Sequence, residues 1–194
     1  MKEKLLTYLQ TQHHFSALEA KKIIYALEAI FSESSKIIIL LTLAIPFHCV
    51  SESIVITVVL LSIRCYSGGL HFSHYVSCLG FSLLFYAVII LLSRYPLSDA
   101  GIALGLILSI GIFALIGPIT SVMRPKLTAA EFSKYAHHTI FVLLFYSVAL
   151  LSWKTLPYRN TIYWVIVLQI FQLLCAHMAQ KGGLHEKIVQ SKDL

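Results

Sequence analysis

The run LGFSLLFYAVIILL at residues 79–92 decides the fold class, because it holds fourteen residues and no charged side chain. A helix needs about 20 apolar residues to cross the hydrocarbon core of a bilayer, so this run and its flanks predict a membrane-spanning helix. The segment RCYSGGLHFSHYVSC, Arg64–Cys78, lies directly before it and contains an arginine, two glycines, two histidines and two cysteines. Lipid-facing helices rarely carry so many polar side chains, so this segment is the candidate functional site.

Composition extends the membrane prediction to the whole chain. Of its 194 residues, 58% are hydrophobic and 12% are charged, with a mean hydropathy of +0.80. A soluble domain carries about 25% charged residues. We therefore expect an all-α polytopic membrane protein, with a single membrane domain over residues 1–194. No basic run is interleaved with aromatic residues, so we expect contact with membrane lipid and no nucleic-acid partner.

Six apolar runs predict about six transmembrane helices. The runs cover residues 36–47, 53–63, 79–93, 101–122, 139–153 and 161–178. The last four are long enough, or nearly so, to span a bilayer. The first two hold about a dozen residues each, and Pro46 favours a turn between them. These two runs form either two short spans, extended at their ends, or one interrupted element.

The two ends of the chain differ from this central bundle at 36–178. Residues 1–35 are amphipathic, with apolar residues that recur at helical spacing between charged ones. Ser16 is a suitable N-cap for a helix that begins near Ala17. Residues 179–194 are polar and form the expected cytoplasmic tail.

The distribution of basic residues predicts the orientation of the bundle. Six spans place the N-terminus and the segments 64–78, 123–138 and 179–194 on one side of the membrane. These segments hold eleven of the fifteen Lys and Arg residues, while Lys36 lies at the boundary of a span. The positive-inside rule assigns this side to the cytoplasm, so both termini and the candidate site are expected there. Cys78 would then remain a reduced thiol.

Cys78 has the sequence surroundings of an activated nucleophile. It lies near a predicted helix N-terminus, with Ser77 as a candidate cap, where unpaired N–H groups and the helix dipole stabilise a thiolate. A histidine within reach would complete the pair. His74 is a neighbour on the same helix face, whereas His71 is about 10 Å away along a straight helix and reaches only if the chain folds back. Geometry leaves both histidines open, and a glycine hinge with a core cysteine is the alternative interpretation.

The spacing Arg64-x-x-x-Gly68-Gly69-x-His71-x6-Cys78 resembles the signature of the accessory gene regulator B (AgrB) family. The members are bacterial membrane cysteine endopeptidases that mature autoinducing peptides in quorum sensing. The segments YALEAIFSESSKIIILL and GPITSVMRPKLTAAEFSKYAH are also similar to the family, as are the length and the hydropathy pattern.

The resemblance implies a role for each residue of the motif. His71 is the general base and Cys78 the nucleophile, while Arg64, Gly68 and Gly69 shape the site. This assignment implies a loop around residues 71–77, because a straight helix favours His74 instead. Phe72 follows His71 at a position where the family has a small residue. We expect this difference to affect the fit of the substrate and to leave the His71 and Cys78 pair unchanged.

The resemblance also implies a substrate and partners. Family members act on a short amphipathic propeptide with an acidic C-terminal segment, in the bacterial cell membrane. Arg124, Lys126 and Lys134 are candidates for docking that acidic segment, although topology and lipid headgroups are the favoured explanation. Glu28 is a candidate for contacting the substrate or orienting the histidine, and its alternative is a solvated glutamate. A second copy of the chain is a further candidate partner.

Two other classes of protein fit parts of the sequence. A membrane exporter of small peptides would use the glycine-rich segment as a gating loop and would need no thiol. A metal-dependent intramembrane protease would use the histidines, but the chain has no HExxH pair, and the adjacent residues His137 and His138 point apart on a helix. We therefore expect no metal and no cofactor.

Overall fold

The computed structural model describes residues 15–69, 74–119 and 128–181, together with a few positions among the first eleven. The described ranges contain the helices α2 (Ala17–Ala44), α3 (Val50–Ser67), α4 (Tyr75–Ser93), α5 (Asp99–Ile116), α6 (Ala129–Ser152) and α7 (Arg159–Lys181). Within these ranges there is no strand, and extended backbone pairs in one isolated bridge between Gly68 and Ile119. The expected all-α class is confirmed.

Five helices, α3 to α7, are long and apolar enough to cross a membrane, as judged over the described part of the chain. The expected polytopic membrane protein is therefore confirmed as a class. The apolar run at 36–47 forms the C-terminal part of α2, which carries Glu33 and Lys36 and does not meet the same criteria. The count of six spans stays a prediction.

Helix α2 begins where the sequence predicts. The Ser16 hydroxyl accepts a hydrogen bond from the backbone N–H of Glu19, and the Glu19 carboxylate accepts one from the backbone N–H of Ser16. This reciprocal capping box satisfies two N–H groups that a helix start leaves without partners. The helix then continues without a break across residues 35 and 36, where the amphipathic segment meets the first apolar run. A turn at 45–48, which includes Pro46, ends it as expected.

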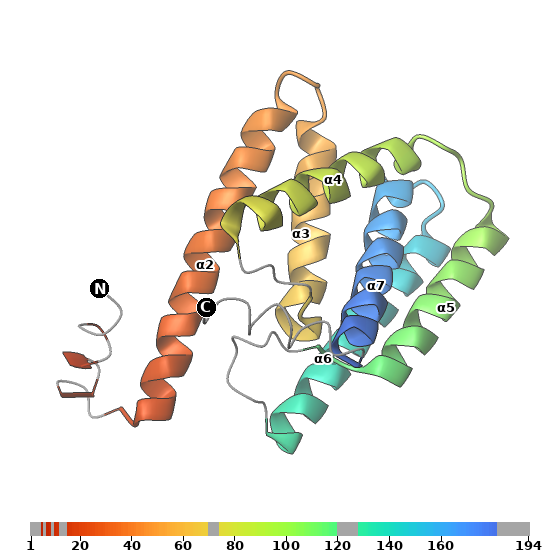
Figure 1. Ribbon diagram of the computed structural model, residues 1–194. Coiled ribbons are helices and arrows are strands. Elements are labelled where there is room, and N and C mark those ends of the chain that lie inside the picture. The colour runs from red at the N-terminus through yellow and green to blue at the C-terminus, as the bar shows by residue number, and fades with distance from the viewer. Residues whose placement is uncertain are drawn as a thin grey trace.

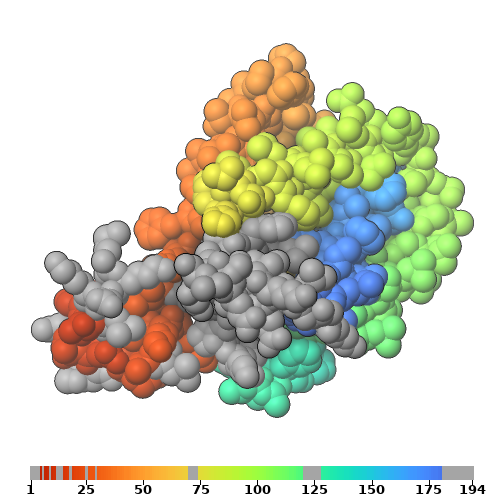
Figure 2. All heavy atoms as spheres, in the orientation of Figure 1, coloured from red at the N-terminus to blue at the C-terminus, as the bar shows by residue number. Residues whose placement is uncertain are grey.

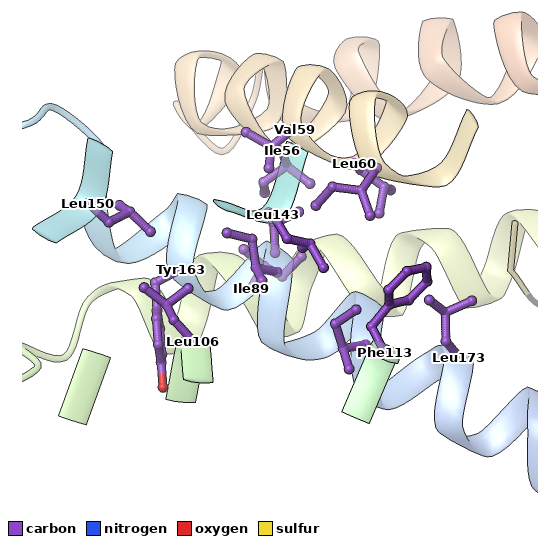
Figure 3. Close-up of a cluster of buried hydrophobic side chains, with 14 of the residues drawn as sticks. Ile56, Val59, Leu60, Ile89, Leu106, Phe113, Leu143, Leu150, Tyr163 and Leu173 are labelled. Carbon is purple, nitrogen blue, oxygen red and sulfur yellow. The ribbon is translucent and has the colours of Figure 1, made fainter. Parts of the chain in front are cut away.

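The apolar core centres on α7, which packs against α3, α4, α5 and α6. Figure 3 shows buried side chains from five helices meeting in this core: Ile56, Val59, Leu60, Ile89, Leu106, Phe113, Leu143, Leu150, Tyr163 and Leu173. Gly105 lets α5 and α7 approach closely because it has no side chain. A Cβ added there would lie 2.1 Å from the Tyr163 hydroxyl oxygen. Small residues at a helix interface allow such close backbone packing in membrane proteins.

Helix α4 runs across the other helices rather than along them. Figure 1 shows its N-terminal end beside the middle of α2 and its body passing in front of α3 towards α7. The hydroxyl groups of Ser35 on α2 and Tyr75 on α4 are 2.8 Å apart, and those of Thr57 on α3 and Tyr86 on α4 are 2.9 Å apart. Hydroxyl pairs of this kind join helices in an apolar bundle. The first pair places the start of α4 against α2, and the second joins the body of α4 to α3.

One face of α4 remains uncovered by the rest of the protein. Figure 2 shows this helix along the surface of the molecule, between α2 and α5. Val76, Leu84 and Leu91 are large apolar side chains on α4 that are exposed. Apolar side chains on the outer face of a spanning helix contact lipid rather than water.

Candidate functional site

Cys78 lies in the first turns of α4. His74 is the N-cap residue with an extended backbone (φ −104°, ψ 133°), and its carbonyl oxygen accepts a hydrogen bond from the backbone N–H of Cys78 at 3.1 Å. The helix therefore begins at Tyr75, three residues before the position expected from Ser77 as a cap. The expected loop is wrong for residues 75–77, because these are already helical.

The thiol of Cys78 is buried against a charged side chain of α2. Cys78 is only 7% exposed, and the ammonium of Lys36 donates a hydrogen bond to its sulfur with an Nζ–Sγ distance of 3.3 Å. Lys36 is itself 2% exposed. Its Nζ also lies 2.5 Å from Oε1 of Glu33, one turn earlier on α2. The sulfur therefore faces a buried ammonium whose carboxylate partner is partly exposed.

A small cavity lies next to this ion pair. Its volume of about 20 Å³ is roughly the space that one water molecule occupies. Side chains from α2, α3 and α4 line it: Glu33, Lys36, Ile37, Leu40, Thr57, Leu60, Leu61, Arg64, Ser82 and Tyr86. Lys36 and Arg64 thus bring two positive charges to one cavity, and Lys36 connects it to Cys78.

Gly68 ends α3 in a conformation that only glycine adopts without strain. Its φ is 74° and its ψ is −152°, and an added Cβ would lie 1.9 Å from the carbonyl oxygen of Ile119. The backbone N–H of Ile119 donates to the Ser67 carbonyl at 2.9 Å, and the Gln169 side chain of α7 donates to the Gly68 carbonyl at 3.1 Å. These contacts hold the end of α3 in place.

Gly69 allows close packing of the Arg64 side chain. An added Cβ at Gly69 would lie 3.0 Å from Nε of Arg64, which is tighter than most real contacts of this kind. Arg64 occupies the last turn of α3 and lines the cavity beside Lys36. A glycine is therefore favoured at the two positions for different reasons. Position 68 requires the backbone conformation of glycine, and position 69 has the Arg64 guanidinium close beside it.

The remaining predicted residues fall in three places. His71, Arg124 and Lys126 lie outside the described residues. Lys134 is exposed on α6, and Glu28 is exposed on α2. Within the described ranges, no group of three His, Cys, Asp or Glu side chains is arranged to hold a metal ion.

Lys36 and Glu33 are the two site residues that the sequence analysis did not select. Both were visible as charged residues next to or within the apolar segment SSKIIILLTLA. A charged group at membrane depth is costly and commonly marks a functional site. This signal could have identified Lys36, although it could not have identified Cys78 as its partner.

The fold and the site define a class, a polytopic helical membrane protein with a buried thiol beside an ion pair. The family described as Accessory gene regulator B matches residues 2–173. A putative AgrB-like protein of Clostridium beijerinckii is 31% identical over 183 residues, which is 88% of this chain and 89% of that protein. No solved structure matches.

The chain belongs to the accessory gene regulator B family. This membership confirms the resemblance seen in the sequence. It supports a role in the processing of an autoinducing peptide, as a processing enzyme in the general sense.

Gly68→Ala should lower the stability of the folded protein. The methyl group meets the Ile119 carbonyl oxygen and the backbone leaves a glycine-only conformation, so we expect a loss of about 2 kcal/mol or more. The matched control is Gly80→Ala on α4, where an added Cβ meets nothing within 4 Å. Thermal unfolding in detergent should show a lower midpoint for Gly68→Ala alone, and equal midpoints would contradict the described geometry.

Proposed function

We propose that this chain is a membrane-embedded cysteine endopeptidase that cleaves the C-terminal part of a small quorum-sensing propeptide. The observation that carries the proposal is the environment of Cys78, whose sulfur accepts a hydrogen bond from the buried ammonium of Lys36. A thiol acts as a nucleophile in its thiolate form, and a neighbouring cation favours that form. Membership of a family of processing enzymes agrees with this chemistry.

The first half of the reaction forms a covalent intermediate on Cys78. His71 takes the proton of the thiol, and the thiolate attacks the carbonyl carbon of the scissile peptide bond. The S–C bond forms as the C–N bond breaks, and the proton passes from His71 to the departing amine. The acidic fragment leaves, and the remaining peptide stays on Cys78 as an acyl-thioester. Arg64, Gly68 and Gly69 shape the site around these atoms.

The second half releases the peptide as a ring. A Cys or Ser side chain of the bound peptide gives its proton to His71 and attacks the thioester carbonyl, and the bond to Cys78 breaks so that Cys78 departs as a thiolate. The product is a cyclic thiolactone or lactone, whereas attack by water would give a linear peptide. Exchange of one thioester for another is nearly neutral in free energy, so loss of the acidic fragment must draw the reaction forward.

The proposed substrate is amphipathic with an acidic C-terminal segment, and the proposed reaction takes place at the cytoplasmic face of the bacterial cell membrane. Basic residues at Arg124, Lys126 and Lys134 would attract the acidic segment. Lys134 is exposed in the first half of α6, where a peptide can reach it. Glu28, on the exposed face of α2, is the candidate for contacting the amphipathic part. A second copy of the chain is a proposed partner.

Cys78→Ala and Cys78→Ser should each abolish propeptide cleavage while the protein still inserts into the membrane. The hydroxyl of serine is far less ionised than a thiol, so we expect a loss of at least about a thousandfold. Cleavage is measured by mass spectrometry of a propeptide produced in the same cells. Cys49→Ala, Cys65→Ala and Cys175→Ala are the controls and should retain most activity. Cleavage by Cys78→Ala would exclude the proposed chemistry and favour a protease that does not use this thiol.

The two histidines of the site should respond differently to substitution. His71→Ala should be inactive in the same assay, because it removes the proposed base. His74→Ala should retain partial activity, because His74 caps α4 through its backbone and its side chain makes no capping hydrogen bond. An inactive His74→Ala beside an active His71→Ala would reverse the assignment of the base.

The orientation of α3 can be tested with two native cysteines. Cys49 directly precedes α3 and Cys65 lies in its last turn, so a spanning α3 puts them on opposite sides of the membrane. Each is kept as the only cysteine of a variant. A membrane-impermeant maleimide should label Cys49 in intact cells and Cys65 only in inverted vesicles. Labelling of Cys65 from outside intact cells would contradict the cytoplasmic site.

A further inference from the structure

Lys36 occupies a position that is costly for a charged residue. Its side chain is 3% exposed, and an ammonium without compensation at such a place costs several kcal/mol. Two groups compensate it, the carboxylate of Glu33 and the sulfur of Cys78. The first comes from the same helix, so the ion pair with Glu33 needs no contact with α4. The direction of a second N–H bond towards sulfur therefore calls for a separate explanation.

We propose that Lys36 is a catalytic residue whose ammonium stabilises the thiolate of Cys78. This inference rests on the proposed function, in which Cys78 is the nucleophile. A hydrogen bond from a charged donor to a charged acceptor is worth about twice one between neutral groups, and low local polarity strengthens it. Lys36 would then act together with His71 and Cys78, and it comes from α2, which is far from both residues in the sequence.

The charge on sulfur changes in both halves of the reaction. The thiolate charge disappears when the S–C bond to the substrate forms, and it returns when that bond breaks and Cys78 departs. Lys36 stabilises the sulfur before the first step and again as the leaving group of the second. It keeps all its protons throughout, because the proton of the thiol moves through His71 to the departing amine. The step therefore balances without an added reactant.

Other charged and titratable groups face the same region from each helix around it. Glu33 and Lys36 come from α2, and Arg64 comes from α3. On α4 itself, Tyr86 lines the cavity and His74 precedes the thiol by one turn. Helix α7 also packs against α4 but contributes no residue to the lining of this cavity. Among the described residues, Lys36 is the cation whose nitrogen lies within hydrogen-bond distance of the Cys78 sulfur.

The test is the rate at which Cys78 reacts with iodoacetamide at different pH values. Cys49, Cys65 and Cys175 are replaced by alanine, and the full chain is purified in detergent without any propeptide. Lys36→Met removes the charge at similar side-chain length. We expect the midpoint of the rate profile to rise by about one pH unit or more, which is a tenfold or greater fall in the thiolate fraction at pH values well below both midpoints.

The shape of the profile separates this role from a structural one. A thiolate that loses its cation becomes intrinsically more nucleophilic, so the rate at high pH should stay equal or rise by up to about threefold. A change in access to Cys78 would instead scale the whole profile and leave its midpoint in place. Lys36→Arg keeps the charge and should retain a midpoint close to that of the parent protein.

Lys22→Met is the matched control. Lys22 also forms an ion pair, with Glu131 at 3.3 Å between α2 and α6, but it has no part in the site. Its loss should leave the midpoint unchanged. If Lys36→Met does not fold, Lys36→Gln provides the same comparison with a polar uncharged side chain.

An unchanged midpoint in a folded Lys36→Met or Lys36→Gln variant would overturn the role of Lys36. This outcome differs from failure of the proposed function, because alkylation needs no substrate. Propeptide cleavage by Cys78→Ala would exclude Cys78 as the nucleophile of the endopeptidase and leave the alkylation result standing. A shifted midpoint together with inactive Cys78→Ala supports both.

Discussion

The buried ammonium of Lys36 is the constraint on which this end of the bundle depends. A charge at this depth requires polar partners, and they come from two helices: Glu33 from α2 and Cys78 from α4. The start of α4 supplies one of these two partners, so its place against α2 is coupled to this charge. The hydroxyl pair of Ser35 and Tyr75 strengthens the same contact one turn away. A single charged group thus couples the position of the thiol to the position of α2.

The rest of α4 is held by a hydroxyl pair and by apolar packing. Tyr86 pairs with Thr57 of α3, and Ile89 is fully buried in the core around α7. The helix that carries the thiol is consequently anchored at its polar start and along its apolar body. Two attachments of different chemistry limit how α4 can tilt or slide.

Membership of the accessory gene regulator B family gives this geometry a chemical context. Peptide processing in a membrane needs a reactive group that can carry charge in an apolar environment. A thiol alone is poorly suited, because burial among apolar groups disfavours its charged form. In the proposed reaction, the buried ammonium of Lys36 beside the sulfur would offset this penalty.

Local signals in the sequence determined the fold class, the start of α2 at Ser16 and the turn at Pro46, because each depends on neighbours within a few residues. The contact between Gly69 and Arg64 is equally local, whereas Gly68 also meets Ile119, which is far from it in the sequence. The start of α4 was misjudged, because its contact with α2 through Tyr75 joins residues forty positions apart. Lys36 and Cys78 are likewise 42 positions apart. Only the packing of α4 on α2 brings this ammonium to this sulfur, and no periodicity or spacing in the sequence encodes a contact between two separate helices.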